Sequence, residues 1–83
     1  MNCKLHVGNL PSSATEMDLR AKFGRFGTVR SAIVVTDAET GRSKRFGFVE
    51  MASDAEARMA IDRLNMTQYE EKIMSVSQAL AGK

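Results

Sequence analysis

The chain has 83 residues, enough for one small domain and too few for two. Hydrophobic residues make up 43% of it, which argues against disorder, and 12 basic against 10 acidic residues give a formal charge of +2. That charge permits nucleic-acid binding but is far below that of strongly charge-driven binders. The single cysteine, Cys3, excludes an internal disulfide and fits a reducing compartment.

The sequence contains no membrane or export signal. No apolar run approaches the roughly 20 residues that a membrane-spanning helix requires, and Lys4 and His6 interrupt any signal-peptide core. We therefore expect a cytoplasmic protein, or a nuclear one if the source is eukaryotic, without membrane contact. The start at Met1 and the lack of a glycine-rich or charged tail lead us to expect a complete short protein.

The first half of the chain predicts a strand, a helix and a second strand. Lys4–Leu10 alternates with the period of two that is typical of a half-buried strand. Thr15 then opens a helix, because Asp18 three residues later completes a capping box, and Gly27 ends it. The apolar stripe of this helix comprises Leu19, Phe23 and Phe26. Val29–Thr36 is rich in β-branched residues and predicts the second strand.

The second half predicts two further strands with a helix between them. A polar loop separates the second strand from the third, Arg45–Met51. Ser53 and Glu56 form a second capping box, and an apolar stripe follows it. This stripe comprises Ala57, Ala60, Ile61 and Leu64. Lys72–Ser77 is a short last strand.

The order of the elements is β-α-β-β-α-β, so we expect one ferredoxin-like α/β (α+β) domain over residues 1–83. Two interlocked right-handed βαβ units place the first and third strands at the centre of a four-stranded antiparallel sheet. Two helices cover only one face of such a sheet. The other face must therefore meet solvent or a partner.

The alternation of the third strand assigns its side chains to the two faces. One set suits helix packing: Gly47, Val49 and Met51. The other set contains a glutamate and therefore belongs on the open face: Phe46, Phe48 and Glu50. On the first strand the same reasoning buries Leu5 and Val7 and exposes His6. Exposed aromatic surface is unfavourable unless something binds it, and nucleic-acid bases stack on such rings.

Two segments resemble the RNA-recognition-motif family. KRFGFVEM (Lys44–Met51) is similar to the RNP1 motif of that family, and LHVGNL (Leu5–Leu10) is similar to the shorter RNP2 motif. The helix segments TEMDLRAKFGRFGTV and ARMAIDRLN also resemble that family, and the chain as a whole resembles its bacterial single-domain members. The resemblance implies the β-α-β-β-α-β fold and binding of single-stranded RNA. It is strong because both motifs fall on the strands where the family has them.

The resemblance also implies which residues bind RNA. The stacking positions of the family fall on His6, Phe46 and Phe48, and its basic first RNP1 position falls on Lys44, which would reach a phosphate. The end of the fourth strand, here Ser77–Ala79, often reads base edges. Secondary candidates near these positions are Arg42, Arg45, Glu50, Ile33, Val35, Ser75, Ser77 and Gln78.

The chain departs from the family pattern at several positions. His6 replaces a larger aromatic residue, and Arg45 replaces the usual RNP1 glycine. Met51 replaces an aromatic residue on the helix-facing side, so it concerns packing. Met66 and Glu71 stand where glycines are common, which puts the shape of the last connection in doubt.

Other functions have less support. A protein partner could bind instead of RNA through an apolar flank of the sheet, which comprises Ile33, Val35 and Ile73. Phe46 and Phe48 would be core residues if the helices packed on their face, which would expose Val49 and Met51. One histidine and one cysteine form no metal cluster and no catalytic set, so we expect no enzyme, no metal and no cofactor. We expect a monomer.

Overall fold

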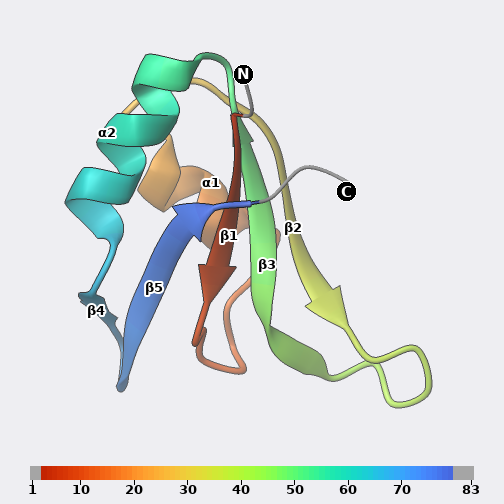
Figure 1. Ribbon diagram of the computed structural model, residues 1–83. Coiled ribbons are helices and arrows are strands. Elements are labelled where there is room, and N and C mark those ends of the chain that lie inside the picture. Colours follow the sequence, from red (N-terminus) through yellow and green to blue (C-terminus); the bar gives the residue numbers. More distant parts are fainter. Residues whose placement is uncertain (1–2, 80–83) are drawn as a thin grey trace.

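The computed structural model describes residues 3–79, which form an α+β fold with a five-stranded antiparallel sheet. The elements are β1 (Lys4–Gly8), α1 (Glu16–Phe23), β2 (Val29–Thr36), β3 (Ser43–Met51), α2 (Asp54–Leu64), β4 (Thr67–Tyr69) and β5 (Lys72–Gln78). The strand order is β2-β3-β1-β5-β4, and Figure 1 shows both helices behind the sheet, on one face. The predicted ferredoxin-like class is confirmed. One domain over residues 1–83 stays a prediction, and its first two and last four positions lie outside the described residues.

The prediction of four strands is wrong, because the connection between α2 and β5 contains a short strand of its own. In β4, Thr67 lies opposite Met74 and Tyr69 lies opposite Lys72. Glu70 has a left-handed φ of 56°, which lets the chain reverse directly into β5. Tyr69 is only 6% exposed, so its burial fixes β4 against the core. A strand of three residues is too short to show a periodic pattern in the sequence.

The start of α1 is as predicted, but its end comes earlier. The N–H of Asp18 donates to the hydroxyl of Thr15 at 3.2 Å, and the N–H of Thr15 donates to the carboxylate of Asp18 at 3.1 Å. This confirms the capping box. The helix ends at Phe23. Phe26 lies in the turn that follows, and its N–H donates to the carbonyl of Phe23. Phe26 therefore follows the helix instead of belonging to its apolar stripe.

Both ends of α2 are tied to other parts of the chain by hydrogen bonds. Ser53 accepts the N–H of Glu56 at 3.2 Å, as expected of an N-cap. The carboxylate of Glu56 accepts the N–H of Thr28 at 3.2 Å instead of the N–H of Ser53. Only the Ser53 half of the second predicted capping box therefore forms. At the other end, the side chain of Asn65 accepts the N–H of Val76 at 2.9 Å. These two bonds fix α2 against the chain before β2 and against β5.

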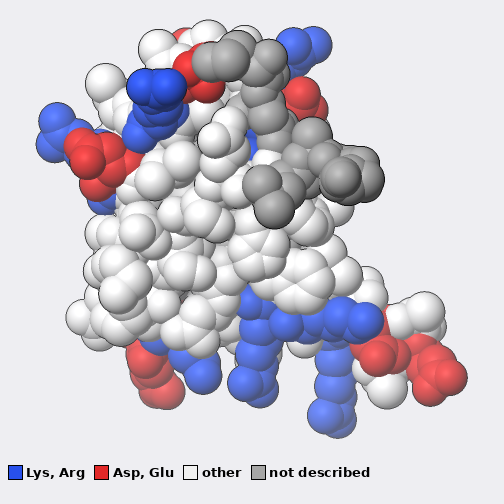
Figure 2. Space-filling model, in the orientation of Figure 1, with Lys and Arg blue, Asp and Glu red and all other residues white. Residues whose placement is uncertain are grey.

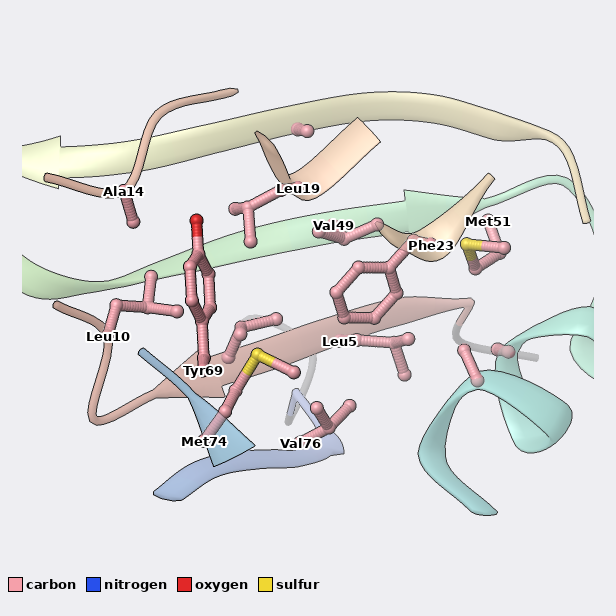
Figure 3. Packing of buried hydrophobic residues seen from close by; sticks show 14 residues of the cluster. Leu5, Leu10, Ala14, Leu19, Phe23, Val49, Met51, Tyr69, Met74 and Val76 are labelled. Carbon is pink, nitrogen blue, oxygen red and sulfur yellow. The ribbon is translucent and has the colours of Figure 1, made fainter. Parts of the chain in front are cut away.

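The core lies between the sheet and the helices, as Figure 3 shows. All five strands of the sheet contribute buried side chains: Leu5, Val7, Ala32, Val49, Met51, Tyr69, Met74 and Val76. From α1 come Leu19 and Phe23, both fully buried. The helix-facing set on β1 and β3 is therefore the predicted one, and the alternative that buries Phe46 and Phe48 in the core is wrong. Within residues 3–79, no helix is long and apolar enough to cross a membrane.

Candidate nucleic-acid interface

Four strands contribute one residue each to a row across the open face of the sheet. His6 of β1 lies opposite Phe48 of β3 on one side and opposite Ser77 of β5 on the other. Ile33 of β2 lies opposite Phe48 on its far side. The row therefore runs from Ile33 through Phe48 and His6 to Ser77. Phe46 lies two residues from Phe48 along β3, on the same face.

His6, Phe46 and Phe48 form an aromatic cluster at the centre of this face. The ring of His6 stacks beside that of Phe46, with centroids 5.5 Å apart and planes inclined by 23°. Phe48 meets His6 at 5.5 Å and Phe46 at 6.0 Å, both edge to face. All three side chains are half-buried. Figure 2 shows the middle of this face without charge and Lys or Arg side chains along its lower edge.

Lys4 belongs to this site, although the sequence reasoning did not include it. Its Nζ lies 5.0 Å from the centroid of the Phe48 ring, within the range of a cation–π contact. Lys4 also lies opposite Glu50, which is half-buried. The signal was present in the sequence, because Lys4 precedes His6 by two residues and so shares its face of β1.

Two glycines on the central strands leave room for close packing around the aromatic cluster. A Cβ at Gly8 would lie 2.9 Å from the hydroxyl oxygen of Ser75 and 3.3 Å from the His6 ring. A Cβ at Gly47 would collide with the backbone carbonyl of Ile33 on β2. Gly8 thus leaves room for movable side chains, whereas Gly47 leaves room for backbone. The approach of β2 to β3 therefore depends on Gly47 more strongly than the packing beside His6 depends on Gly8.

The start of β3 departs from regular pairing. The register of β2 with β3 shifts between Val34 and Thr36, where one residue of β2 spans three residues of β3, positions 44–46. Arg45, in the middle of this bulge, has a left-handed φ of 67°. Strict alternation along β3 therefore stops at Arg45. Lys44 and Arg45 are both exposed at the edge of the open face.

The other predicted site residues surround the aromatic cluster. Exposed among them are Ile33, Arg42, Ser77 and Gln78. Half-buried among them are Val35, Glu50 and Ser75. Gln78 lies opposite Leu5, at the end of β5 and outside the row that contains His6. Ala79, by contrast, is buried, so its side chain is not available to a ligand.

The groups with shifted pKa values lie away from the aromatic cluster. Backbone hydrogen bonds lower the carboxyl pKa of Asp18 at the start of α1, mainly from Thr15, and that of Asp37 after β2, mainly from Thr40. Burial raises the pKa of Tyr69 on β4 to about 12. Nowhere in residues 3–79 do three potential metal ligands gather.

Comparison with known proteins agrees with this geometry. A sheet whose uncovered face carries aromatic rings on its two central strands is the architecture of one class of nucleic-acid-binding domains. The family model for the RNA recognition motif matches residues 5–75. The chain belongs to this family.

The similar proteins span most of the chain. RbpD of Nostoc sp., whose name assigns it RNA binding provisionally, is 41% identical over 75 residues, 90% of this chain and 80% of its own length. The crystal structure of RNA binding protein PG1 superposes with a TM-score of 0.93, and its sequence is 41% identical to this one; the match covers 98% of both chains. A Sxl-lethal protein/RNA complex is 31% identical, with a TM-score of 0.94 over all of this chain and 50% of the other.

Proposed function

We propose that this domain binds single-stranded RNA on the open face of its sheet, with bases stacked on His6, Phe46 and Phe48. The observation that carries the proposal is the aromatic cluster itself, three half-buried rings on the open face of the central strands. The same fold is found in a protein/RNA complex that is 31% identical to this chain. Lys44 at the edge of the cluster supplies a contact to phosphate.

The expected affinity follows from the size of the cluster. Base–aromatic stacking contributes roughly 1–3 kcal/mol per base, so two or three bases account for most of a moderate affinity. Few cations border the cluster, so charge adds a smaller share. Binding without strong sequence preference is the natural result of stacking, because every base has a π-face.

A titration followed by NMR tests the proposal. Isotope-labelled protein is mixed with a pool of random single-stranded RNA of about eight nucleotides, a length within the usual site size of such domains. We expect the largest shifts at the amides of β1 and β3 around His6, Phe46 and Phe48. The matched control is Phe48→Ala, which keeps the fold and removes the central ring. Shifts confined to α1 and α2, or no shifts, would contradict the proposal.

A protein partner on the apolar flank is the second candidate, because Ile33 is 45% exposed and Ile73 is 47% exposed. The strand order places Ile33 on β2 and Ile73 on β5, with β3 and β1 between them. A partner that covers both residues would also cover the aromatic cluster and so compete with RNA. The arrangement favours RNA, with these side chains flanking the stacked bases.

The proposal assigns the domain a binding role instead of an enzymatic one, and a monomeric state. Stacking and phosphate contacts need no proton transfer and no metal. The aromatic cluster is contained within a single copy of the chain, so a monomer suffices for the function.

A further inference from the structure

Arg45 occupies a backbone conformation that suits glycine better than arginine. Its φ of 67° lies in the left-handed region, where a Cβ crowds the following carbonyl oxygen. The fold fixes this conformation from two sides. The carbonyl of Arg45 accepts the N–H of Leu10 at 2.9 Å, and the N–H of Arg45 donates to the hydroxyl of Ser43 at 2.9 Å. Neither bond uses the Arg45 side chain, so a glycine would keep both.

The side chain of Arg45 borders two shallow hollows at this end of the sheet. The larger, of about 440 Å³, is lined by Arg45 and by Ser12, Gly41, Arg42 and Ser43. Its lining therefore includes two arginines and two serines and no acidic residue. The smaller hollow, of about 230 Å³, adds Lys72 to Arg45 but also contains Glu70 and Glu71. An anion is attracted into the larger hollow and repelled by the carboxylates of the smaller one.

The larger hollow lies next to the aromatic cluster along the chain. Arg45 immediately precedes Phe46, whose ring stacks beside that of His6. An RNA strand that continues from a base on Phe46 towards the start of β3 brings its next phosphate to this end of the strand. Guanidinium groups are suited to phosphate, because their fork of N–H donors forms two parallel hydrogen bonds to it.

We propose that Arg45 and Arg42 bind a phosphate of the RNA strand in the larger hollow, as a subsite beyond the aromatic cluster. The inference rests on the proposed function, since the ligand is the same strand. The left-handed arginine then has a physical explanation: the position gives up fold stability in exchange for a phosphate contact. Glycine at this position would reverse both effects.

The test measures RNA affinity and fold stability together. Arg45→Gly and the parent are titrated with a fluorescent pool of random single-stranded RNA of about eight nucleotides, between about 50 and 200 mM salt. We expect Arg45→Gly to weaken binding about five- to tenfold at low salt and to reduce the log–log salt slope by about one. The urea midpoint of unfolding should rise. Arg45→Lys should keep the slope.

Two controls separate charge from backbone strain. Met66 has a similar φ of 66° and is 68% exposed, so Met66→Gly should raise the urea midpoint and leave RNA binding unchanged. Arg63 is an exposed cation on α2, and Arg63→Ala should leave the salt slope unchanged.

The outcomes distinguish the subsite from the proposed function. If Arg45→Gly keeps the affinity and slope of the parent while Phe48→Ala weakens binding, the subsite is wrong and the proposed function stands. If Arg63→Ala reduces the slope as much as Arg45→Gly, the effect is general charge and the subsite is also wrong. A parent protein that does not bind the RNA pool overturns both.

Discussion

Phe48 is held by neighbours on three sides yet keeps part of its ring open. The rings of His6 and Phe46 meet it edge to face, and Lys4 lies 5.0 Å from its centroid. Phe48→Ala should weaken RNA binding by roughly 1–3 kcal/mol, the usual loss for one base stack. It should lower the free energy of unfolding by only about 1 kcal/mol, because the ring contacts are partly exposed.

Val49 is the matched control for Phe48, because it is the next residue of β3 and is fully buried on the other face. Val49→Ala should lower the free energy of unfolding by about 1–3 kcal/mol and leave the RNA affinity of the folded protein near that of the parent. Urea unfolding and fluorescence anisotropy on both variants check the pair. The reverse pattern would show that the two faces of β3 are wrongly assigned.

At the scale of elements, the approach of β2 to β3 depends on Gly47. A methyl group there would meet the carbonyl of Ile33, which is backbone and cannot move aside without disturbing the ladder. Gly47→Ala should therefore lower the free energy of unfolding by about 1–3 kcal/mol, as overpacking does. Gly8→Ala is the control, because its methyl group would meet only the movable side chains of Ser75 and His6. Thermal unfolding should show a larger loss for Gly47→Ala, and equal losses would contradict this account.

A second link between elements joins α1 to β4. A side-chain hydrogen bond from Tyr69 helps to lower the pKa of Asp18, after the larger effect of the Thr15 N–H. Burial, followed by the same hydrogen bond to Asp18, raises the pKa of Tyr69 from 10.0 to about 12. Lys22 lies over the Tyr69 ring, with its Nζ 4.3 Å from the ring centroid. The fold therefore prefers a charged Asp18 and a neutral Tyr69.

These preferences predict how stability changes with pH. Asp18 has a lowered pKa in the fold, so its contribution is present above its unfolded value and is lost as pH falls through the folded value. Tyr69 has a raised pKa, so its contribution is present below 10.0 and is lost as pH rises towards about 12. Tyr69→Phe should remove the alkaline loss and weaken the dependence at acid pH. Urea midpoints across the pH range check this, and an unchanged alkaline limb would contradict it.

The sequence predicted those elements that show a periodic residue pattern or a pair of mutually capping residues. Alternation over β3 assigned Phe48 and Val49 correctly, and the pair Thr15–Asp18 marked the start of α1. Two features that escaped prediction have no local signal of their own. Arginine as a residue type does not indicate a left-handed bulge at position 45, because arginine is disfavoured there, and Glu56 bonds to Thr28 across 28 positions of the chain.

At the scale of the whole molecule, the number of cations near the open face determines the salt dependence of binding. Within residues 3–79, the cations on or at the edge of the open face include Lys4, Arg42, Lys44 and Arg45. Two to four phosphate contacts give a log–log slope of about −1.5 to −3 for a single strand. Anisotropy titrations of the parent at several salt concentrations measure it. A much steeper slope would mean that a basic surface elsewhere dominates binding.

The strand order also determines when the RNA-binding face exists during synthesis. β1 is made first, but its partners are β3 and β5, and the row through His6 ends at Ser77 near the other end of the described chain. Contacts so distant in sequence form late in folding. While the residues after β3 are still inside the ribosome, β5 cannot pair with β1. One edge of β1 is then unpaired, and the row lacks Ser77. Translation must therefore pass Gln78 before the domain can hold RNA on its complete face.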